Sequence, residues 1–419
     1  MPRKTFLQTI ATLLVIAIIT TAIYFLPPVH QRFAWRVNLV LTYIRGIVDP
    51  IEAMPTALAP QTEVANTVPL PSPTPTRTVA PTPTKPGPTS TPLPTPTPIP
   101  ASVALPAPPY ELQDWNNCGP ATLAMYLRYY GWEGDQFAIA DVVKPLREDR
   151  NVNVEELVYY VRNHAGWLNI EFRVGGTIED LKKYLAAGIP VMIEEGTQLE
   201  KKFWPSDDMW AGHYLLLTGY DDTSQQFNMI DSYHKEVTTT TYEHLEENWQ
   251  AFNHVYILVY RPEQAETVKT LMGEDLDIDA NRRKALEQSK AAAESDPDNA
   301  YTWFNIGSNH VYFEEYGEAA RAYDKAREIG LPQRMFLYQF GPYFSYFHTM
   351  RIDELMTSTE YILELPSRPE SEEAHLWHGW GLFRQGDRIG AREEFLTALE
   401  DNPLYLDAQY ALEFLVNNP

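Results

Sequence analysis

The pattern of hydrophobic and polar positions divides the 419-residue chain into stretches of different character, and the first is an apolar run. Residues 6–26 carry no charge, and 21 such residues are long enough to cross a bilayer as a helix. Arg3 and Lys4 precede the run, which favours a cytoplasmic N-terminus, although three arginines also follow it. We therefore expect an uncleaved single-pass membrane anchor, with a cleaved signal peptide as the alternative.

The stretch that follows the apolar run has a helical period. Apolar residues between positions 30 and 48 recur at helical spacing and predict a second helix, so residues 1–50 are interpreted as an anchor plus a juxtamembrane helix. This helix either lies on the membrane surface or only connects the anchor to the rest.

Residues 51–109 show no periodic pattern. Positions 55–109 hold 18 of the 34 prolines, mixed with Thr, Ser and Val. Such a composition forms no core and favours extended polyproline II conformations, which predicts a disordered Pro/Thr-rich stalk. The expected arrangement is a cell-surface protein whose C-terminal domains are extracytoplasmic and held away from the membrane.

Residues 110–262 contain stretches with helical spacing of apolar residues as well as short apolar runs typical of strands, which together predict an α+β domain. Helical spacing marks residues 121–130, 154–165, 177–187 and 242–248, and short apolar runs mark strands at 188–193, 211–222, 227–231 and 255–260. The loop 194–210, which is rich in aromatic residues, is open to two interpretations: a wall of a cleft, or a surface loop tucked onto the sheet.

Residues 281–419 are helical throughout and show an internal repeat, after a connector at 263–280. Gly307 precedes Ala319 by 12 residues, and Gly379 precedes Ala391 by the same interval. This spacing resembles about three tetratricopeptide (TPR) repeats, an all-α solenoid in which small residues let paired helices approach. The resemblance implies that this part binds a protein partner or the substrate.

The composition of the chain argues against several classes of function. The chain has 33 Lys plus Arg against 56 Asp plus Glu, a net charge of −23, which argues against binding nucleic acid. The single cysteine excludes an internal disulfide framework and a multi-cysteine zinc site. The histidines lack the usual metal-ligand spacings, so we expect no metal and no cofactor.

The single cysteine has a distinctive context. Cys118 stands directly before Gly-Pro and the helix expected at 121–130, so it lies at or near a helix N-terminus, where the helix dipole and free amides stabilise a thiolate. Gln113, five residues earlier, carries a side-chain amide that can donate to an oxyanion beside the sulfur. A small buried structural cysteine is the alternative.

A thiol nucleophile also needs a base, and the later strands offer one. His213 begins the strand 211–222, and Asp231 ends the strand 227–231, so a hairpin of the two would bring them together. The carboxylate would then hold the imidazole tautomer. Asp221 and Asp222 are better interpreted as part of the hairpin turn.

These residues in this order resemble the papain-like cysteine peptidases, and in particular the family of bacteriocin-processing, double-glycine leader peptidases. The resemblance covers residues 110–262 and implies Cys118 as nucleophile, His213 as general base, Asp231 as its orienting partner and Gln113 as oxyanion donor. The chain has no transporter membrane bundle and no phosphate-binding loop, so export driven by ATP hydrolysis is not implied. We expect a membrane-anchored cysteine peptidase that acts on peptide or protein substrates. The alternatives are an inactive peptide-binding scaffold of the same fold, and an acyl transferase or amidase.

Overall fold

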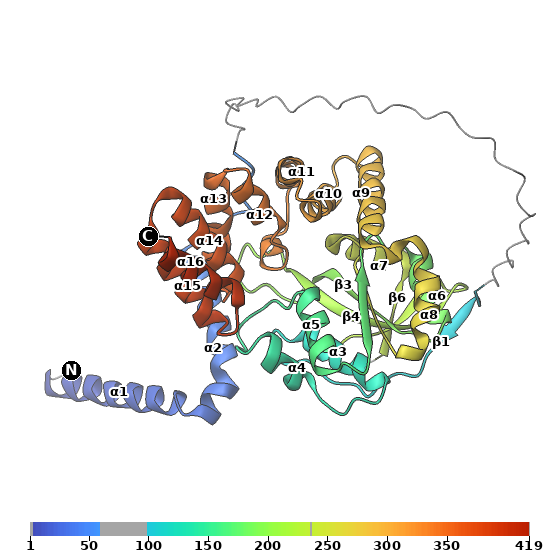
Figure 1. Cartoon of the computed structure of the whole chain (residues 1–419). Helices are drawn as coiled ribbons and strands as arrows, with labels where there is room; N and C mark the ends of the chain where they lie inside the picture. The colour runs from blue at the N-terminus through green and yellow to red at the C-terminus, as the bar shows by residue number, and fades with distance from the viewer. Residues whose placement is uncertain (1–2, 59–98, 235–236, 419) are drawn as a thin grey trace, which may run out of the picture.

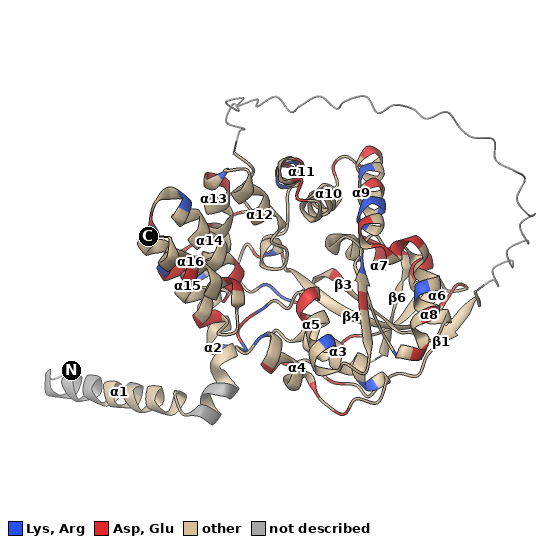
Figure 2. Cartoon of the chain, in the orientation of Figure 1, with Lys and Arg blue, Asp and Glu red and all other residues tan. Residues whose placement is uncertain are grey.

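The computed structural model describes residues 3–58, 99–234 and 237–418, and most of the predicted stalk lies outside these ranges. The described residues form a sheet domain over residues 102–272 and a helical domain over residues 278–417 (Figure 1). In Figure 2 the ribbon segments coloured for Asp and Glu occur along both domains.

The sheet domain is built on one antiparallel sheet in the order β2-β7-β3-β4-β5-β6, with β1 paired to β4. Its longest strand, β4, pairs with β3 on one side and β5 on the other. The strands are β1 Ser102–Ala104, β2 Asn169–Arg173, β3 Val191–Gln198, β4 Trp210–Asp221, β5 Gln226–Ile230, β6 Val237–Thr241 and β7 Tyr256–Tyr260.

Helices cover both faces of this sheet because successive strand residues point to opposite sides. Met192, Leu216 and Ile257 join the core that includes α3 (Cys118–Tyr129), α4 (Gln136–Val143) and α5 (Val154–His164). Their strand neighbours Ile193, Leu215 and Leu258 join the other core. That core includes α6 (Ile178–Ala186), α7 (Tyr242–Trp249) and α8 (Ala265–Met272). The expected antiparallel sheet with helices is thus confirmed.

The helical domain consists of α9–α16, in which consecutive helices pack on one another. Gly307 and Gly379 allow two of these contacts, because a Cβ there would lie 2.6 Å from Tyr323 and 2.5 Å from Phe395. The helical character is confirmed, whereas the assignment to tetratricopeptide repeats stays a prediction. The helices are α9 Ile278–Ser295, α10 Ala300–Tyr312, α11 Tyr316–Ile329, α12 Gly341–His348, α13 Ile352–Leu363, α14 Glu372–Gln385, α15 Arg388–Asp401 and α16 Leu406–Asn417.

Two helices, α1 (Arg3–Tyr24) and α2 (Pro27–Val48), precede both domains. Over the described residues, no helix combines the length and the hydropathy that crossing a bilayer requires, so the predicted membrane-spanning helix is not confirmed. The two ends of the predicted stalk pack against the domains. Residues 51–58 contact the helical domain, and β1 belongs to the sheet.

The loop between β3 and β4 joins the two domains. Its Asp207 forms a buried ion pair of 2.7 Å with Arg334, and its Trp204 donates from Nε1 to Gln333 Oε1 at 3.2 Å. The Trp204 side chain is fully buried. The loop therefore docks onto the helical domain, an arrangement that neither interpretation of the sequence anticipated.

Candidate active site

The candidate nucleophile lies where the sequence predicted it, at the start of a helix. Helix α3 begins at Cys118, with Asn117 as N-cap residue and no side-chain cap on the first turn. The thiol is partly buried and receives a backbone hydrogen bond from Tyr214 on β4. The unpaired amides of a first helical turn make this a favourable place for negative charge.

The chain just before Cys118 is held in an unusual conformation. Asn116 has a φ of 53°, in the left-handed region that non-glycine residues seldom adopt. The buried Lys144 donates to the Asn116 carbonyl at 2.8 Å. Gln136 Oε1 accepts from both the Asp114 amide and the Asn117 side chain, each at 2.7 Å. These bonds fix the turn that presents the thiol.

The structure brings His213 and Asp231 together through the β4–β5 hairpin. His213 Nε2 lies 2.8 Å from Asp231 Oδ1, and both side chains are buried. The Tyr233 amide donates to the same carboxylate oxygen at 2.8 Å. Because Nε2 faces Asp231, Nδ1 is the ring nitrogen left to interact with the Cys118 thiol, whose pKa His213 lowers.

This arrangement shifts the ionisation of all three groups. Burial raises the pKa of the Cys118 thiol, but the hydrogen bond and charge of His213, with smaller contributions from Tyr214 and Lys144, outweigh it and lower the pKa from its usual value. Burial lowers the pKa of His213, but Asp231 and Cys118 raise it overall to about 10. Burial likewise opposes ionisation of Asp231, yet His213 holds its pKa below the usual value. The geometry therefore favours a thiolate–imidazolium pair.

Gln113 lies at the same site, tied to the residue after Asp231. Its backbone amide donates to the Ser232 carbonyl at 2.9 Å, and its side-chain Oε1 accepts from the Ser232 hydroxyl at 2.8 Å. Among the described residues, no hydrogen bond engages its Nε2. The bond from Ser232 to Oε1 therefore orients the side-chain amide and leaves Nε2 as a donor for a further hydrogen bond.

Several charged residues near the thiol were missed by sequence reasoning. Lys144 was one of them. Its only signal in the sequence was its position as a charged residue directly after an apolar helical stretch. Glu194 and Glu195 on β3 are also buried, and Glu195 is paired in register with His213. Burial raises the pKa of Glu195 to about 7, and that of Glu194 well above its usual value. A charge pattern cannot reveal such burial, which depends on the neighbouring strand.

The helical domain also packs against the residue before the histidine. A Cβ on Gly212, the residue before His213, would lie 2.8 Å from Phe252 Cζ and 2.9 Å from Tyr338 Cδ1. The Tyr338 ring, from the segment before α12, meets Trp210 edge-on with centroids 5.7 Å apart. The start of β4 is therefore packed between the domains. Among the described residues, no cluster of three or more His, Cys, Asp or Glu side chains could hold a metal ion.

Comparison with known proteins agrees with this geometry. Residues 104–257 match the model of the Peptidase_C39-like family. No curated protein sequence matches the chain.

Three of the solved structures that match part of this chain are those of peptidases. A C39-like peptidase from Bacillus anthracis is 20% identical over 38% of this chain and 98% of that chain, with a TM-score of 0.31. Xylellain, a cysteine protease from Xylella fastidiosa, is 14% identical over 39% and 87%, with a TM-score of 0.30. The peptidase domain of Streptococcus ComA, a bifunctional ABC transporter involved in quorum sensing, is 16% identical over 36% and 96%, with a TM-score of 0.28.

Proposed function

We propose that the protein is a cysteine peptidase that hydrolyses peptide bonds through a thioester on Cys118. The observation that carries this proposal is the continuous chain of contacts from Cys118 through His213 to Asp231, with Gln113 beside it. A domain that only bound peptides would not need a thiol with a lowered pKa next to a free amide donor.

Acylation follows from the positions of these groups. The Cys118 thiolate attacks the carbonyl carbon of the peptide bond, and Gln113 Nε2 donates to the oxygen as it gains negative charge. His213 then gives its Nδ1 proton to the departing amine as the C–N bond breaks. The first product leaves as an amine, and the acyl group remains on sulfur.

Deacylation reverses the proton transfer. His213, now neutral, takes a proton from a water molecule as that water attacks the thioester carbonyl. The C–S bond breaks, a carboxylic acid is released, and the thiolate–imidazolium pair is restored. Throughout the cycle Asp231 keeps the imidazole in one orientation through its bond to Nε2.

The test is to incubate the purified full chain with a peptide library and identify new termini by mass spectrometry, with Cys118→Ala as control. We expect cleavage by the parent alone, with one ¹⁸O atom entering each new carboxyl terminus from labelled water. Products that carry an added amine instead of ¹⁸O would identify an acyl transferase. The absence of any product together with an unreactive thiol would favour the peptide-binding scaffold.

We further propose that α1 anchors the chain in a membrane, with the catalytic and helical domains on the extracytoplasmic side. The support is the uncharged run 6–26 after Arg3 and Lys4, and the outward position of apolar side chains such as Leu13 and Ile18. Protease treatment of intact cells tests this: digestion of the C-terminal domains without lysis is expected, and full protection would contradict it.

A further inference from the structure

Residues 51–58, here called the docking segment, lie against the helical domain and are bound mainly through their backbone. The carbonyl oxygen of Glu52 accepts from the Tyr361 hydroxyl at 3.0 Å, and that of Pro55 accepts from Arg327 Nε at 3.0 Å. At the far end, the Leu58 amide donates to Glu354 Oε1 at 2.5 Å. Both donors and acceptors of the peptide backbone are thus recognised.

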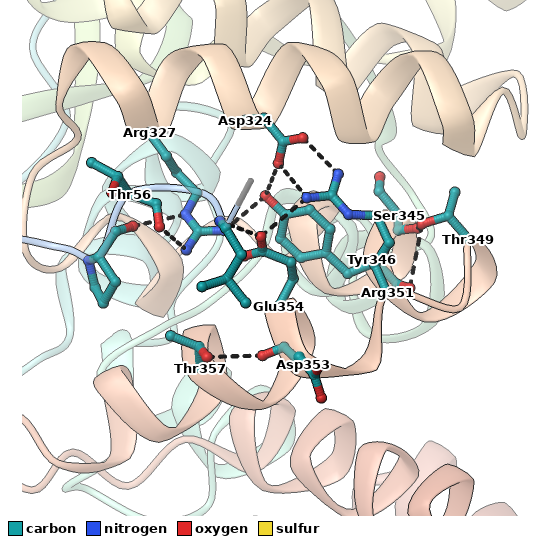
Figure 3. A network of polar contacts seen from close by, with 12 residues as sticks. Thr56, Asp324, Arg327, Ser345, Tyr346, Thr349, Arg351, Asp353, Glu354 and Thr357 are labelled. Atoms are coloured by element: carbon teal, nitrogen blue, oxygen red, sulfur yellow. Dashed lines mark hydrogen bonds and ion pairs between the residues drawn. The ribbon is translucent and has the colours of Figure 1, made fainter. Parts of the chain in front are cut away.

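The receiving groups also hold one another in place. Figure 3 shows Arg327 and Glu354 facing one another, with the ion pair at 2.6 Å, and Tyr346 accepting from Arg327 at 3.0 Å. Arg351 holds the other oxygen of Glu354 at 3.1 Å and pairs with Asp324 at 2.6 Å. This network leaves Arg327 Nε and Nη2 to bind the carbonyl oxygens of Pro55 and Thr56.

The docking segment completes the burial of this network. With the segment in place, the side chain of Arg327 is 0% exposed and that of Glu354 is 4% exposed. The Nε and Nη2 hydrogens of Arg327 are then removed from water and donate to the Pro55 and Thr56 carbonyl oxygens instead. A peptide backbone, which offers successive carbonyl and amide groups, matches the donors and acceptors of this network.

One side chain of the segment adds an apolar anchor. Met54 is 6% exposed and belongs to the same buried cluster as Leu331, Tyr361 and Ile362. Glu52, Ala53, Thr56 and Leu58 are exposed. The site therefore combines backbone recognition with one buried apolar side chain, that of Met54.

We propose that the helical domain is a binding site for a peptide backbone, and that its ligand is the docking segment of the same chain. While docked, the segment closes the site to other peptides and keeps α2 beside the domains, where Arg45 also donates to the Pro366 carbonyl at 3.2 Å. Beyond residues 59–98, the sheet holds the chain again, since Tyr220 donates to the Pro100 carbonyl at 2.6 Å.

Methionine oxidation measures docking in the intact chain. Met54 is buried only through docking, whereas Met350 is 59% exposed and serves as internal control. In dilute peroxide we expect Met54 to oxidise on the order of tenfold more slowly than Met350. Leu58→Pro removes the N–H that Glu354 binds and should speed Met54 oxidation several-fold, whereas Leu58→Ala keeps the N–H and should not. Equal rates at Met54 and Met350, or equal effects of the two substitutions, would overturn the proposal.

A second measurement tests whether the site accepts a peptide. A labelled synthetic peptide of residues 50–58 should bind saturably, by fluorescence anisotropy, to a full chain whose residues 51–58 are replaced by Gly and Ser. It should not bind the parent. Adding Tyr361→Phe to the replaced chain should weaken binding by about fivefold, because one hydrogen bond is lost. Binding to the parent, or unfolding of the helical domain on replacement, would show that the segment is not an exchangeable ligand.

Discussion

At the scale of single residues, the site depends on how burial and charge oppose each other at Cys118. Burial alone would keep the thiol protonated, and His213 reverses this because Asp231 stabilises its positive charge. The sequence predicted these residues because each has a local signal, such as a helix start or a strand end. It could not predict Lys144, whose effect on the thiol exists only because the helix α4 ends beside Asn116.

Gln113→Ala tests the oxyanion role. Loss of one donor to a developing oxyanion should lower kcat by on the order of 10²-fold or more. The rate of Cys118 alkylation should stay unchanged, because Gln113 is not among the groups that shift the thiol pKa. Peptide hydrolysis and alkylation are measured on the same preparation. A parallel loss of both would show that Gln113 acts on the thiol itself or on the fold.

The pH dependence of hydrolysis tests whether His213 carries its proton at neutral pH. Since the pKa of His213 is raised to about 10, the proton that the leaving amine needs stays on the ring at neutral pH and is lost as the pH rises through about 10. kcat/KM should therefore fall on an alkaline limb near that pH. Asp231→Asn removes the carboxylate that raises the pKa and should move the limb to lower pH. A limb that does not move would contradict the assignment of Asp231.

At the scale of elements, the start of β4 positions the histidine. This strand carries His213 on an end that is enclosed by Phe252 and Tyr338, and Gly212 is the residue that leaves room for both rings. Elements with clear periodicity, such as α3, α6 and β4, were predicted to within a few residues. The helix α4 and the strands β2 and β6 were not, because the apolar run of α4 is short and Thr-rich β6 has one largely exposed face.

Gly212→Ala tests this packing. The added Cβ forces Phe252 and Tyr338 to move, which should cost about 1–3 kcal/mol of unfolding free energy and lower kcat/KM by displacing His213. Gly317→Ala in α11 is the control, because its Cβ would meet nothing within 4 Å and its stability should be unchanged or slightly higher. Thermal unfolding and hydrolysis rates report the two effects. Equal behaviour of both variants would refute a tight fit at Gly212.

At the scale of the whole molecule, the two domains are connected by specific long-range contacts. The buried pair Arg334–Asp207, the ring of Tyr338 and the docking segment all cross between parts that are distant in sequence. The sequence predicted separate domains on a stalk, and it contains no local signal for these long-range contacts. From the sequence alone, charged residues such as Arg334 and Asp207 are expected at the surface, because nothing local shows that they pair with each other in the interior.

The variant Arg334→Ala tests the contact between the two domains. It leaves Asp207 buried without a counter-ion, since the two side chains are 2% and 0% exposed, and should cost about 3–5 kcal/mol. Arg321→Ala is the control: this residue pairs with Glu318, both are more than half exposed, and its loss should cost less than about 1 kcal/mol. Chemical denaturation measures both. Similar small losses would mean that Asp207 is not held by this pair.

The most direct test of the central claim is the pH dependence of Cys118 alkylation in the full chain. Cys118 is the only thiol, so every label reports this site. The account predicts labelling by iodoacetamide with a midpoint below the usual thiol pKa of about 8.5, and His213→Ala should return the midpoint to that range or above it. Labelling of the parent only above about pH 8, unchanged by His213→Ala, would show an ordinary thiol and contradict the account.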